Sequence, residues 1–275
     1  ALTHEITCPF NTLRRSGWKA ERELGLHFLK KDIVMLYRAL YTALLLLVLA
    51  PSLTAQNPSA TKSNVPPSRS TYFGRRIAQT MHFTGAPWLI RDNRENEERC
   101  SVMLGQLNLK TGMTVCDMGC GNGFYALKMA KMVGPQGTIL GVDVQPEMLQ
   151  FLRTRMEKEG VDNITPILGS FHNPHLPRNT VDVILMVDVY HELSHPEIML
   201  RAMRDSLKPN GQIILLEYRE EDPKVPIRPL HKMNKVQILK EYEANGFRIA
   251  SQFDKLPWQH MMFFEKDPDW KPSGK

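Results

Sequence analysis

The chain has 275 residues, of which 42% are hydrophobic and 23% are charged, the composition of an ordinary globular protein. This composition excludes a wholly disordered, collagen-like or multi-span membrane chain, and four cysteines are too few for a disulfide-built scaffold. The formal net charge is +6, but residues 1–55 hold seven Lys and Arg against four Asp and Glu, so half of the excess lies there. The small remainder does not indicate a nucleic-acid partner.

An apolar run at residues 39–50 (ALYTALLLLVLA) follows Arg38 and precedes Pro51. This layout is typical of a secretory signal peptide, with cleavage after Ala55. The run is shorter than the roughly 20 apolar residues that span a bilayer, but residues 33–50 can serve as an uncleaved membrane anchor. A buried core helix is a third interpretation. Residues 1–55 are therefore predicted to be an extension that exports the protein or associates it with a membrane.

The segment at residues 56–70 is rich in Pro, Ser, Asn and Thr and predicts a flexible linker. We expect a lid segment at 71–94, a folded domain at 95–267 and a tail at 268–275. Within the domain, helical spacing predicts helices at 95–107, 123–133, 146–160, from Pro196 onward, and at 235–245. Runs rich in β-branched residues predict strands at 114–118, 138–142, 164–168, 181–187, 212–217, 247–253 and 260–265.

The alternation of strands with helices predicts an α/β fold of three layers, Rossmann-like, around a seven-stranded, mostly parallel sheet. The last two strands are joined by a hairpin, which makes the last strand antiparallel. In such sheets the ligand site lies at the carboxyl ends of the strands.

A glycine-rich turn at residues 115–123 (VCDMGCGNG) connects a predicted strand to a helix. Glycines there let the backbone approach a ligand and leave amide donors at the helix N-terminus facing it. The spacing is G-x-G-x-G with Asp117 two residues before the first glycine, and it differs from the G-x-G-x-x-G of dinucleotide sites. Asp143 ends the next strand, twenty residues after Gly123, where it can accept hydrogen bonds from two ribose hydroxyls.

With these residues the chain resembles class I S-adenosylmethionine-dependent methyltransferases, whose first motif is an acidic residue followed by G-x-G-x-G. The resemblance covers about residues 95–266, including 181–190 (VDVILMVDVY) and 207–211 (LKPNG), and its core is similar to quinone-type C-methyltransferases. It implies S-adenosylmethionine as cofactor, with Asp117 and the glycines holding the methionine moiety, Asp143 the ribose and Val144 the adenine. The implied cofactor-binding residues are Asp117, Gly119, Cys120, Gly121, Asn122, Gly123, Asp143, Val144, Ser170, Phe171 and Asp188.

The chain departs from the family pattern after the third strand. Many members have an aspartate there that accepts a hydrogen bond from the adenine amine, whereas this chain has Gly169, Ser170 and Phe171. We expect Ser170 to supply a weaker hydrogen bond and Phe171 to pack on the ring.

A competing motif is residues 191–195 (HELSH), which match the H-E-x-x-H of zinc proteases. That motif needs a helix, but these residues directly follow an apolar strand, and Pro196 would break a helix that carried them. We therefore interpret the segment as a loop, and no metal site is predicted.

Several polar residues are expected at the carboxyl edge of the sheet, beside the position of the sulfonium methyl. His191 is predicted as the base or orienting residue of methyl transfer, with Glu217 or His260 as its partner. Predicted substrate contacts are Tyr190, Glu192, His231 and Trp258. Residues 218–232 and 83–91 are candidate lids over the site.

The predicted function is therefore methyl transfer from S-adenosylmethionine to a small or lipophilic acceptor. Arsenite methyltransferases resemble this core but need several exposed thiols to bind arsenic. Here Cys116 lies in a buried strand and Cys120 in the glycine turn, so only Cys100 is expected to have a free thiol. We therefore do not expect arsenite to be the acceptor. S-adenosylmethionine is made in the cytosol, so an exported chain would lack it. An exported, non-catalytic binding protein on the same fold is the first alternative, and a zinc hydrolase that uses His191 and His195 is a weaker one.

Overall fold

The computed structural model describes residues 65–272. The apolar run at 39–50 and most of the predicted linker lie outside the described residues, so the predicted signal peptide or anchor does too. No helix within residues 65–272 combines the length and apolar character that a membrane span requires.

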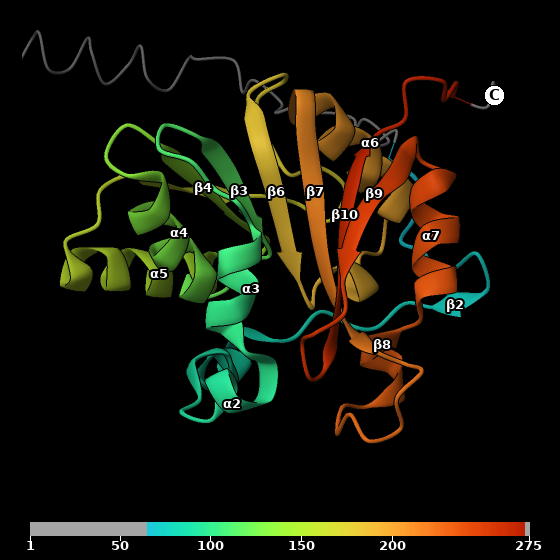
Figure 1. Cartoon of the computed structure of the whole chain (residues 1–275), viewed down its shortest axis with the longest axis horizontal. Coiled ribbons are helices and arrows are strands. Elements are labelled where there is room, and N and C mark those ends of the chain that lie inside the picture. The colour runs from blue at the N-terminus through green and yellow to red at the C-terminus, as the bar shows by residue number, and fades with distance from the viewer. Residues whose placement is uncertain (1–64, 273–275) are drawn as a thin grey trace, which may run out of the picture. The chain divides into compact units, whose positions relative to one another are not determined.

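A twisted sheet of eight strands forms the centre of the fold (Figure 1). Seven strands follow the spatial order β5-β4-β3-β6-β7-β10-β9, and β8 pairs with β7 beside this path. The strands are β3 (Thr114–Met118), β4 (Thr138–Asp143), β5 (Ile164–Leu168), β6 (Val181–Val187), β7 (Leu207–Arg219), β8 (Lys232–Met233), β9 (Phe247–Phe253) and β10 (Gln259–Lys266). Strands β3 to β7 pair in parallel, and β10 runs antiparallel between β7 and β9. The predicted mostly parallel sheet with an antiparallel closing strand is confirmed.

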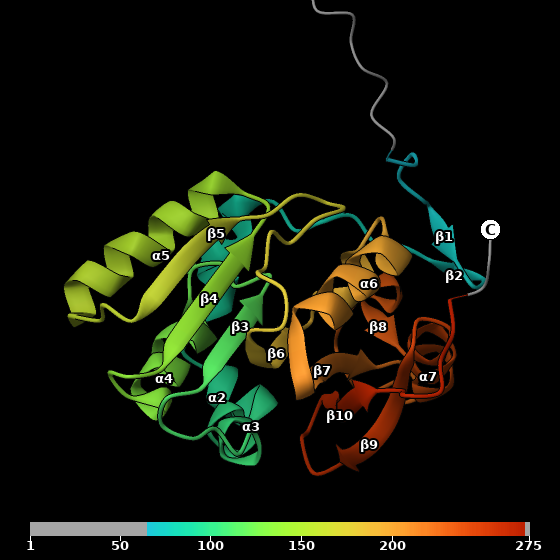
Figure 2. The ribbon, with the colours of Figure 1, turned by 90° about the horizontal axis from the view of Figure 1, so that it is seen from above.

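Helices cover both faces of the sheet, which gives three layers (Figure 2). One face carries α3 (Cys100–Gln106), α4 (Phe124–Val133) and α5 (Pro146–Glu159), and the other carries α6 (Pro196–Ser206) and α7 (Lys235–Glu243). The core is accordingly divided into two clusters of buried side chains, one on each side of the sheet.

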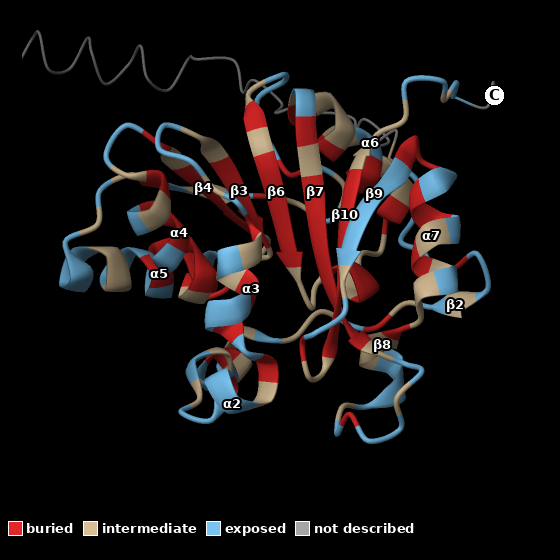
Figure 3. Cartoon of the chain, in the orientation of Figure 1, coloured by how far each residue is buried: buried red, intermediate tan, exposed pale blue. Residues whose placement is uncertain are grey.

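The central strands are buried on both faces, while the edge strand β9 is mostly exposed (Figure 3). Strand β6 is apolar except for Asp182, which lies near its amino end. Asp182 accepts hydrogen bonds from the Thr114 backbone N–H and from Lys208 Nζ, so the one carboxylate in the strand is satisfied. A strand with both faces covered reads as a continuous apolar run, as the sequence of β6 does.

Some boundaries differ from those predicted from the sequence. The helix expected at 95–107 is divided into α2 (Arg94–Glu98) and α3, because Arg99 between them adopts a left-handed backbone with φ of 52°. Strand β7 begins at Leu207, five residues before the predicted start, and a register shift against β6 accommodates the Pro-Asn-Gly stretch. An eighth strand, β8, begins at Lys232, the last residue of the segment expected to form a lid.

The amino-terminal lid segment contains a small hairpin of β1 (Thr71–Tyr72) and β2 (Arg75–Arg76) and a 3-10 helix, η1 (Phe83–Ile90). Part of the predicted flexible linker is held in place. His195 Nε2 lies 2.9 Å from the Pro66 carbonyl oxygen, and the Arg69 N–H donates to the Ser194 carbonyl. These bonds attach the last residues of the predicted linker to the folded domain.

A buried ion pair ties this hairpin to α7. Arg75 donates from Nε and Nη2 to the two carboxylate oxygens of Glu241, at 2.8 and 2.9 Å, and Tyr190 Oη donates to the same carboxylate at 2.8 Å. Glu241 has no exposed surface, so its charge depends on these partners. Removing one partner of such a pair leaves an uncompensated buried charge.

We therefore expect Glu241→Ala to lower the free energy of unfolding by about 3 to 5 kcal/mol, measured by urea denaturation. Glu159→Ala is the matched control, because Glu159 pairs with the largely exposed Lys131 and its loss costs about 1 kcal/mol or less. Equal effects of the two substitutions would contradict a special role for the buried pair.

Candidate active site

A cavity of about 610 Å³ opens at the carboxyl ends of the parallel strands. Its size is that of a small-molecule site, and most of its lining is apolar. The amino-terminal segment contributes Thr80, Met81, Trp88, Leu89 and Arg94, and the ends of β3 and β4 contribute Met118, Gly119, Gly121, Val142, Asp143, Val144 and Gln145. The rest of the lining is Met148, Ser170, Phe171, Val187, Asp188, Val189, His191, Glu192, Leu193, Met199, Tyr218, Pro226, Ile227, Arg228 and His231.

The glycine turn forms one wall of this cavity. Gly119 and Gly121 have positive φ angles of 70° and 52°. A Cβ on Gly119 would lie 2.6 Å from a methyl of Val189, and one on Gly121 would lie 2.5 Å from a methyl of Leu89, both residues of the cavity lining. Only glycine fits these positions, because both the backbone conformation and the space exclude a side chain.

Asp143 is held at the end of β4 by the turn itself. Its Oδ2 accepts from the Gly121 N–H and its Oδ1 from the Gln145 N–H, both at 2.9 Å. Burial raises the pKa of Asp143, and the backbone donors oppose that rise. Each carboxylate oxygen keeps a second lone pair, so the group can accept two hydrogen bonds from vicinal hydroxyls in the cavity.

Two buried carboxylates near the cavity are only partly satisfied. Asp117 Oδ2 and Asp188 Oδ1 have no hydrogen-bond partner among the described residues. Burial raises the pKa of Asp117 to about 7 and that of Asp188 well above its ordinary range. Asp188 also has a left-handed backbone, with φ of 55°, and its Oδ2 accepts from Gln259. A carboxylate that lines a cavity with an unpartnered oxygen suits a cationic ligand.

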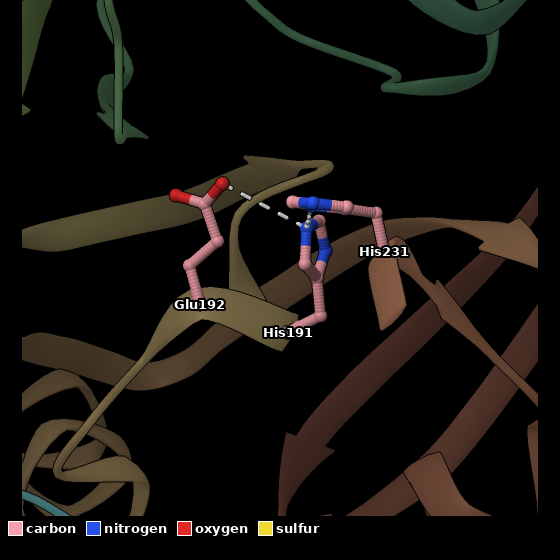
Figure 4. A group of neighbouring side chains, drawn as sticks. All are labelled: His191, Glu192 and His231. Carbon is pink, nitrogen blue, oxygen red and sulfur yellow. Dashed lines mark hydrogen bonds and ion pairs between the residues drawn. The ribbon is translucent and has the colours of Figure 1, made fainter. Parts of the chain in front are cut away.

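The far end of the cavity holds the histidines (Figure 4). His191 lies on the 3-10 turn η2 (Tyr190–Glu192), and its backbone N–H and Nδ1 contact the two oxygens of Glu217 at 3.0 and 2.7 Å. Its Nε2 lies 3.0 Å from Nδ1 of His231, on η3 (Pro229–His231). Burial lowers the pKa of His191, but Glu217 outweighs it and leaves the pKa above its ordinary value. Burial and His191 lower the pKa of His231.

The cavity brings together many of the predicted residues. Of the predicted cofactor residues, Gly119, Gly121, Asp143, Val144, Ser170, Phe171 and Asp188 line it, and so do His191, Glu192 and His231. Ser170 Oγ bonds within its own turn, to Asn173, and Phe171 is half exposed at the rim. Both predicted lids contribute lining, through η1 and through Pro226, Ile227 and Arg228.

The other predicted cofactor residues lie behind the glycine turn that lines the cavity. Asp117, Cys120, Asn122 and Gly123 are buried but are not part of the lining. Asn122 donates to the Ala86 carbonyl, so its amide links the turn to η1. Gly123, with φ of 80°, begins α4. In this structure these residues shape the turn and do not line the cavity, and their contact with the cofactor stays a prediction.

Three further predictions are corrected. Tyr190 points into the core, where its hydroxyl donates to Glu241, because the 3-10 turn directs neighbouring residues to opposite sides. His260 bonds to Glu221 at 2.7 Å, and Trp258 packs on Tyr218, so neither lies in the lining. Glu217, by contrast, is the partner of His191 that the sequence predicted, and it acts as a positioning residue because it is fully buried behind the ring.

The structure also tests two interpretations drawn from the sequence, which concern the thiol of Cys100 and a zinc site at His191 and His195. Cys100 has a free thiol, as expected, but the thiol is buried rather than exposed and accepts a hydrogen bond from Tyr125. His195 turns its Nε2 to the Pro66 carbonyl and its Nδ1 to Ser194 Oγ. His191 and His195 therefore do not form the pair that a zinc hydrolase would need.

Sequence reasoning missed part of the lining, above all Arg94 and Met81. Arg94 is buried and donates to Glu98 and to the Leu89 carbonyl. The Met81 N–H donates to the Glu192 carboxylate at 3.2 and 3.3 Å. An arginine within an acidic helical stretch looks like a surface residue, and a single methionine in a lid carries no pattern, so no sequence signal marked either.

The fold and this cavity are those of a class I methyltransferase, and comparison with known proteins agrees. A family model described as a methyltransferase domain matches residues 109–261, more than half of the chain. The chain therefore belongs to the methyltransferase domain family. The predicted membership of the class I S-adenosylmethionine-dependent methyltransferases is confirmed, and with it S-adenosylmethionine as the cofactor.

Curated relatives match over the same domain. The ubiquinone/menaquinone biosynthesis C-methyltransferase UbiE of Cupriavidus metallidurans is 29% identical over 148 residues, which are 54% of this chain and 58% of the relative. UbiE of Burkholderia orbicola is 30% identical over 157 residues, 56% of each chain. The chain thus spans just over half the length of the curated relatives it matches.

Solved structures share the fold. A SAM-dependent methyltransferase from Aquifex aeolicus has a TM-score of 0.64 at 26% identity, and the match covers 67% of this chain and 98% of that one. The [4+2]-cyclase SpnF has a TM-score of 0.50 at 22% identity, covering 57% of this chain and 60% of its own. The second likeness concerns the fold alone, so the reaction must be argued from the site.

The residues present fit S-adenosylmethionine. Gly119 and Gly121 bring their backbone to the cavity wall at positions where a Cβ would collide with a neighbouring side chain. Asp143 faces the cavity as a ribose acceptor, and Asp188 lines it with one buried oxygen that has no partner among the described residues. Asp143 carries the most specific of these contacts, because its two hydrogen bonds would be charge-assisted.

We expect Asp143→Ala to weaken binding of S-adenosylhomocysteine at least about 100-fold in calorimetry, because two bonds of about 1.5 to 3 kcal/mol each are lost. Asp162→Ala, which removes an exposed aspartate, should leave the affinity unchanged. Equal affinity of the Asp143→Ala protein and the unchanged chain would contradict the ribose assignment.

Asp117 predicts a pH dependence of stability. Its pKa is raised by burial from 3.8 to about 7, so between these values the folded state holds a proton that the unfolded state has released. The free energy of unfolding of the unchanged chain should therefore fall, relative to Asp117→Asn, as pH rises from about 4 to about 7. Urea denaturation of both proteins across this window measures the difference, and a constant offset would contradict the raised pKa.

Proposed function

We propose that the chain transfers the methyl group of S-adenosylmethionine to a small, lipophilic, oxygen-bearing acceptor of the quinol class. The observation that carries the proposal is the cavity lining outside the glycine turn. Leu193, Met199 and Ile227 contribute apolar side chains to this lining, and the buried His191 contributes a polar one. An apolar pocket with few polar groups suits an acceptor that is mostly hydrocarbon with one or two oxygens.

Similarity to UbiE supports the choice of a quinone-type acceptor, since those relatives are described as C-methyltransferases of ubiquinone and menaquinone biosynthesis. The match covers the methyltransferase domain and just over half of each relative. The comparisons support this enzyme over the two alternatives, an exported binding protein and a zinc hydrolase.

Bound S-adenosylmethionine supplies an electrophilic methyl group on a sulfonium. The transfer is an in-line displacement in which the bond from sulfur to the methyl breaks as the acceptor forms its new bond. The protein aligns the two partners and keeps water out. Glu217 fixes the His191 ring through Nδ1, so that Nε2 is directed toward His231 at the cavity end and can hold an acceptor oxygen.

The two lid segments complete the site. The η1 segment contributes Trp88 and Leu89, and the turn after β7 contributes Pro226 and Ile227. These segments lie far apart in the sequence, and both contribute to the lining of the same largely apolar cavity. We further propose that the apolar run at 39–50 brings the enzyme to membranes, where a lipophilic acceptor is concentrated.

We expect His191→Ala to lower turnover about 100-fold or more with an alkylated hydroquinone as acceptor, because its ring orients the acceptor oxygen. Transfer of labelled methyl from S-adenosylmethionine into the organic phase is the readout. His175→Ala, a change of an exposed histidine outside the cavity, is the control. Unchanged turnover in the His191→Ala protein would contradict the assigned role, and no transfer to any quinol by the unchanged chain would overturn the proposed function.

A further inference from the structure

Three side chains at the far end of the cavity place donor atoms around one point (Figure 4). Nε2 of His191 lies 3.0 Å from Nδ1 of His231 and 3.8 Å from Oε1 of Glu192. The three donor atoms all lie within 4.8 Å of one another. His191 and Glu192 are neighbours on η2, and His231 reaches them from η3, forty residues later in the chain.

We propose that His191, Glu192 and His231 bind a divalent transition-metal ion of the zinc class, and that this ion holds the oxygen of the methyl acceptor. Two imidazole nitrogens and one carboxylate oxygen are the protein ligands of catalytic zinc sites that keep a fourth position open. The same donor set binds other divalent metals of the first transition row.

The geometry suits such an ion with small adjustments. Metal–ligand distances of about 2.0 to 2.2 Å in a tetrahedral site place the donor atoms roughly 3.3 Å apart. The observed 3.0 and 3.8 Å lie on either side of this value. Glu192 is the side chain that must move most, and its bonds to the Met81 N–H are long, at 3.2 and 3.3 Å.

Glu217 prepares His191 to be a ligand. Its Oε2 lies 2.7 Å from Nδ1 of His191, which places the ring proton on Nδ1 and leaves the lone pair of Nε2 directed at the proposed ion. A carboxylate behind a metal-binding histidine is the usual second layer of such sites. Glu217 has no exposed surface, and it also accepts from the His191 backbone N–H, so the ring position is tightly determined.

The charges around the site favour a cation. Among residues 65–272, neither Glu192 nor Glu217 forms an ion pair with a lysine or arginine. Arg75 is paired with Glu241 and Arg94 with Glu98, so neither neutralises these carboxylates. Arg228, which lines the cavity, forms no ion pair within residues 65–272 and is one positive charge against them. Asp188 adds a further carboxylate to the cavity lining. A bound divalent ion would offset this concentration of buried negative charge.

The open position of the ion would face the cavity, which narrows the acceptor class. A phenol, enol or hydroxyquinone would bind through its oxygen as an anion, with the hydroxyl proton passing to solvent. This acceptor role rests on the proposed function, whereas the metal site itself does not.

The test uses the full chain, stripped with a chelator and titrated with Co²⁺ and Zn²⁺. We expect one equivalent of metal per chain, and for Co²⁺ the strong visible absorption of a four-coordinate ion. His231→Ala and Glu192→Gln should each weaken metal binding at least about 100-fold, and Glu217→Gln about 10- to 100-fold. His175→Ala, which changes a histidine outside the cavity, should bind metal like the unchanged chain.

Retained binding of S-adenosylhomocysteine shows that each variant is folded. Absence of stoichiometric metal binding, or equal metal affinity of the His231→Ala and unchanged chains, would overturn the metal site. Metal binding without methyl transfer to any acceptor would overturn the proposed function and leave the metal site standing. Methyl transfer at full rate by the metal-free chain would overturn the acceptor role of the ion.

Discussion

The fully buried carboxylate of Glu217 is the constraint on which the acceptor end of the site depends. It lies near the end of β7, and its described partners are the backbone N–H and Nδ1 of His191, just past β6. Because β6 and β7 are parallel neighbours, their carboxyl ends meet at one edge of the sheet, and the carboxylate can be satisfied only while both strands keep their register. The same pairing determines where the His191 ring points.

The site has two ends that differ in how they bind. The cofactor end is shaped mainly by the backbone, through glycines in the left-handed conformation and through amides that donate to Asp143. At the acceptor end side chains from separate loops converge, with His191 and Glu192 from one turn and His231 from another. This division matches the chemistry of the family, in which the cofactor is constant while the acceptor differs from one enzyme to another.

The features that could be predicted from the sequence belong mostly to the cofactor end of the site. The glycine turn, Asp143 and the succession of strands and helices along the chain were predictable because contiguous residues and regular spacing determine them. The direction of side chains in the turn after β6 was not, since Tyr190 in the core and His191 in the cavity are consecutive residues. The position of His231 depends on the irregular segment after β7, which has no periodicity. His260 was expected at the site because its strand approaches it, but its ring bonds to Glu221 instead.

The most direct test of this account is a crystal structure of the full chain with S-adenosylhomocysteine. The account predicts the ribose hydroxyls on Asp143, the methionine moiety along Gly119 and Gly121, and the sulfur directed toward His191. A ligand bound elsewhere, or one bound in this cavity with its sulfur directed away from His191, would contradict it.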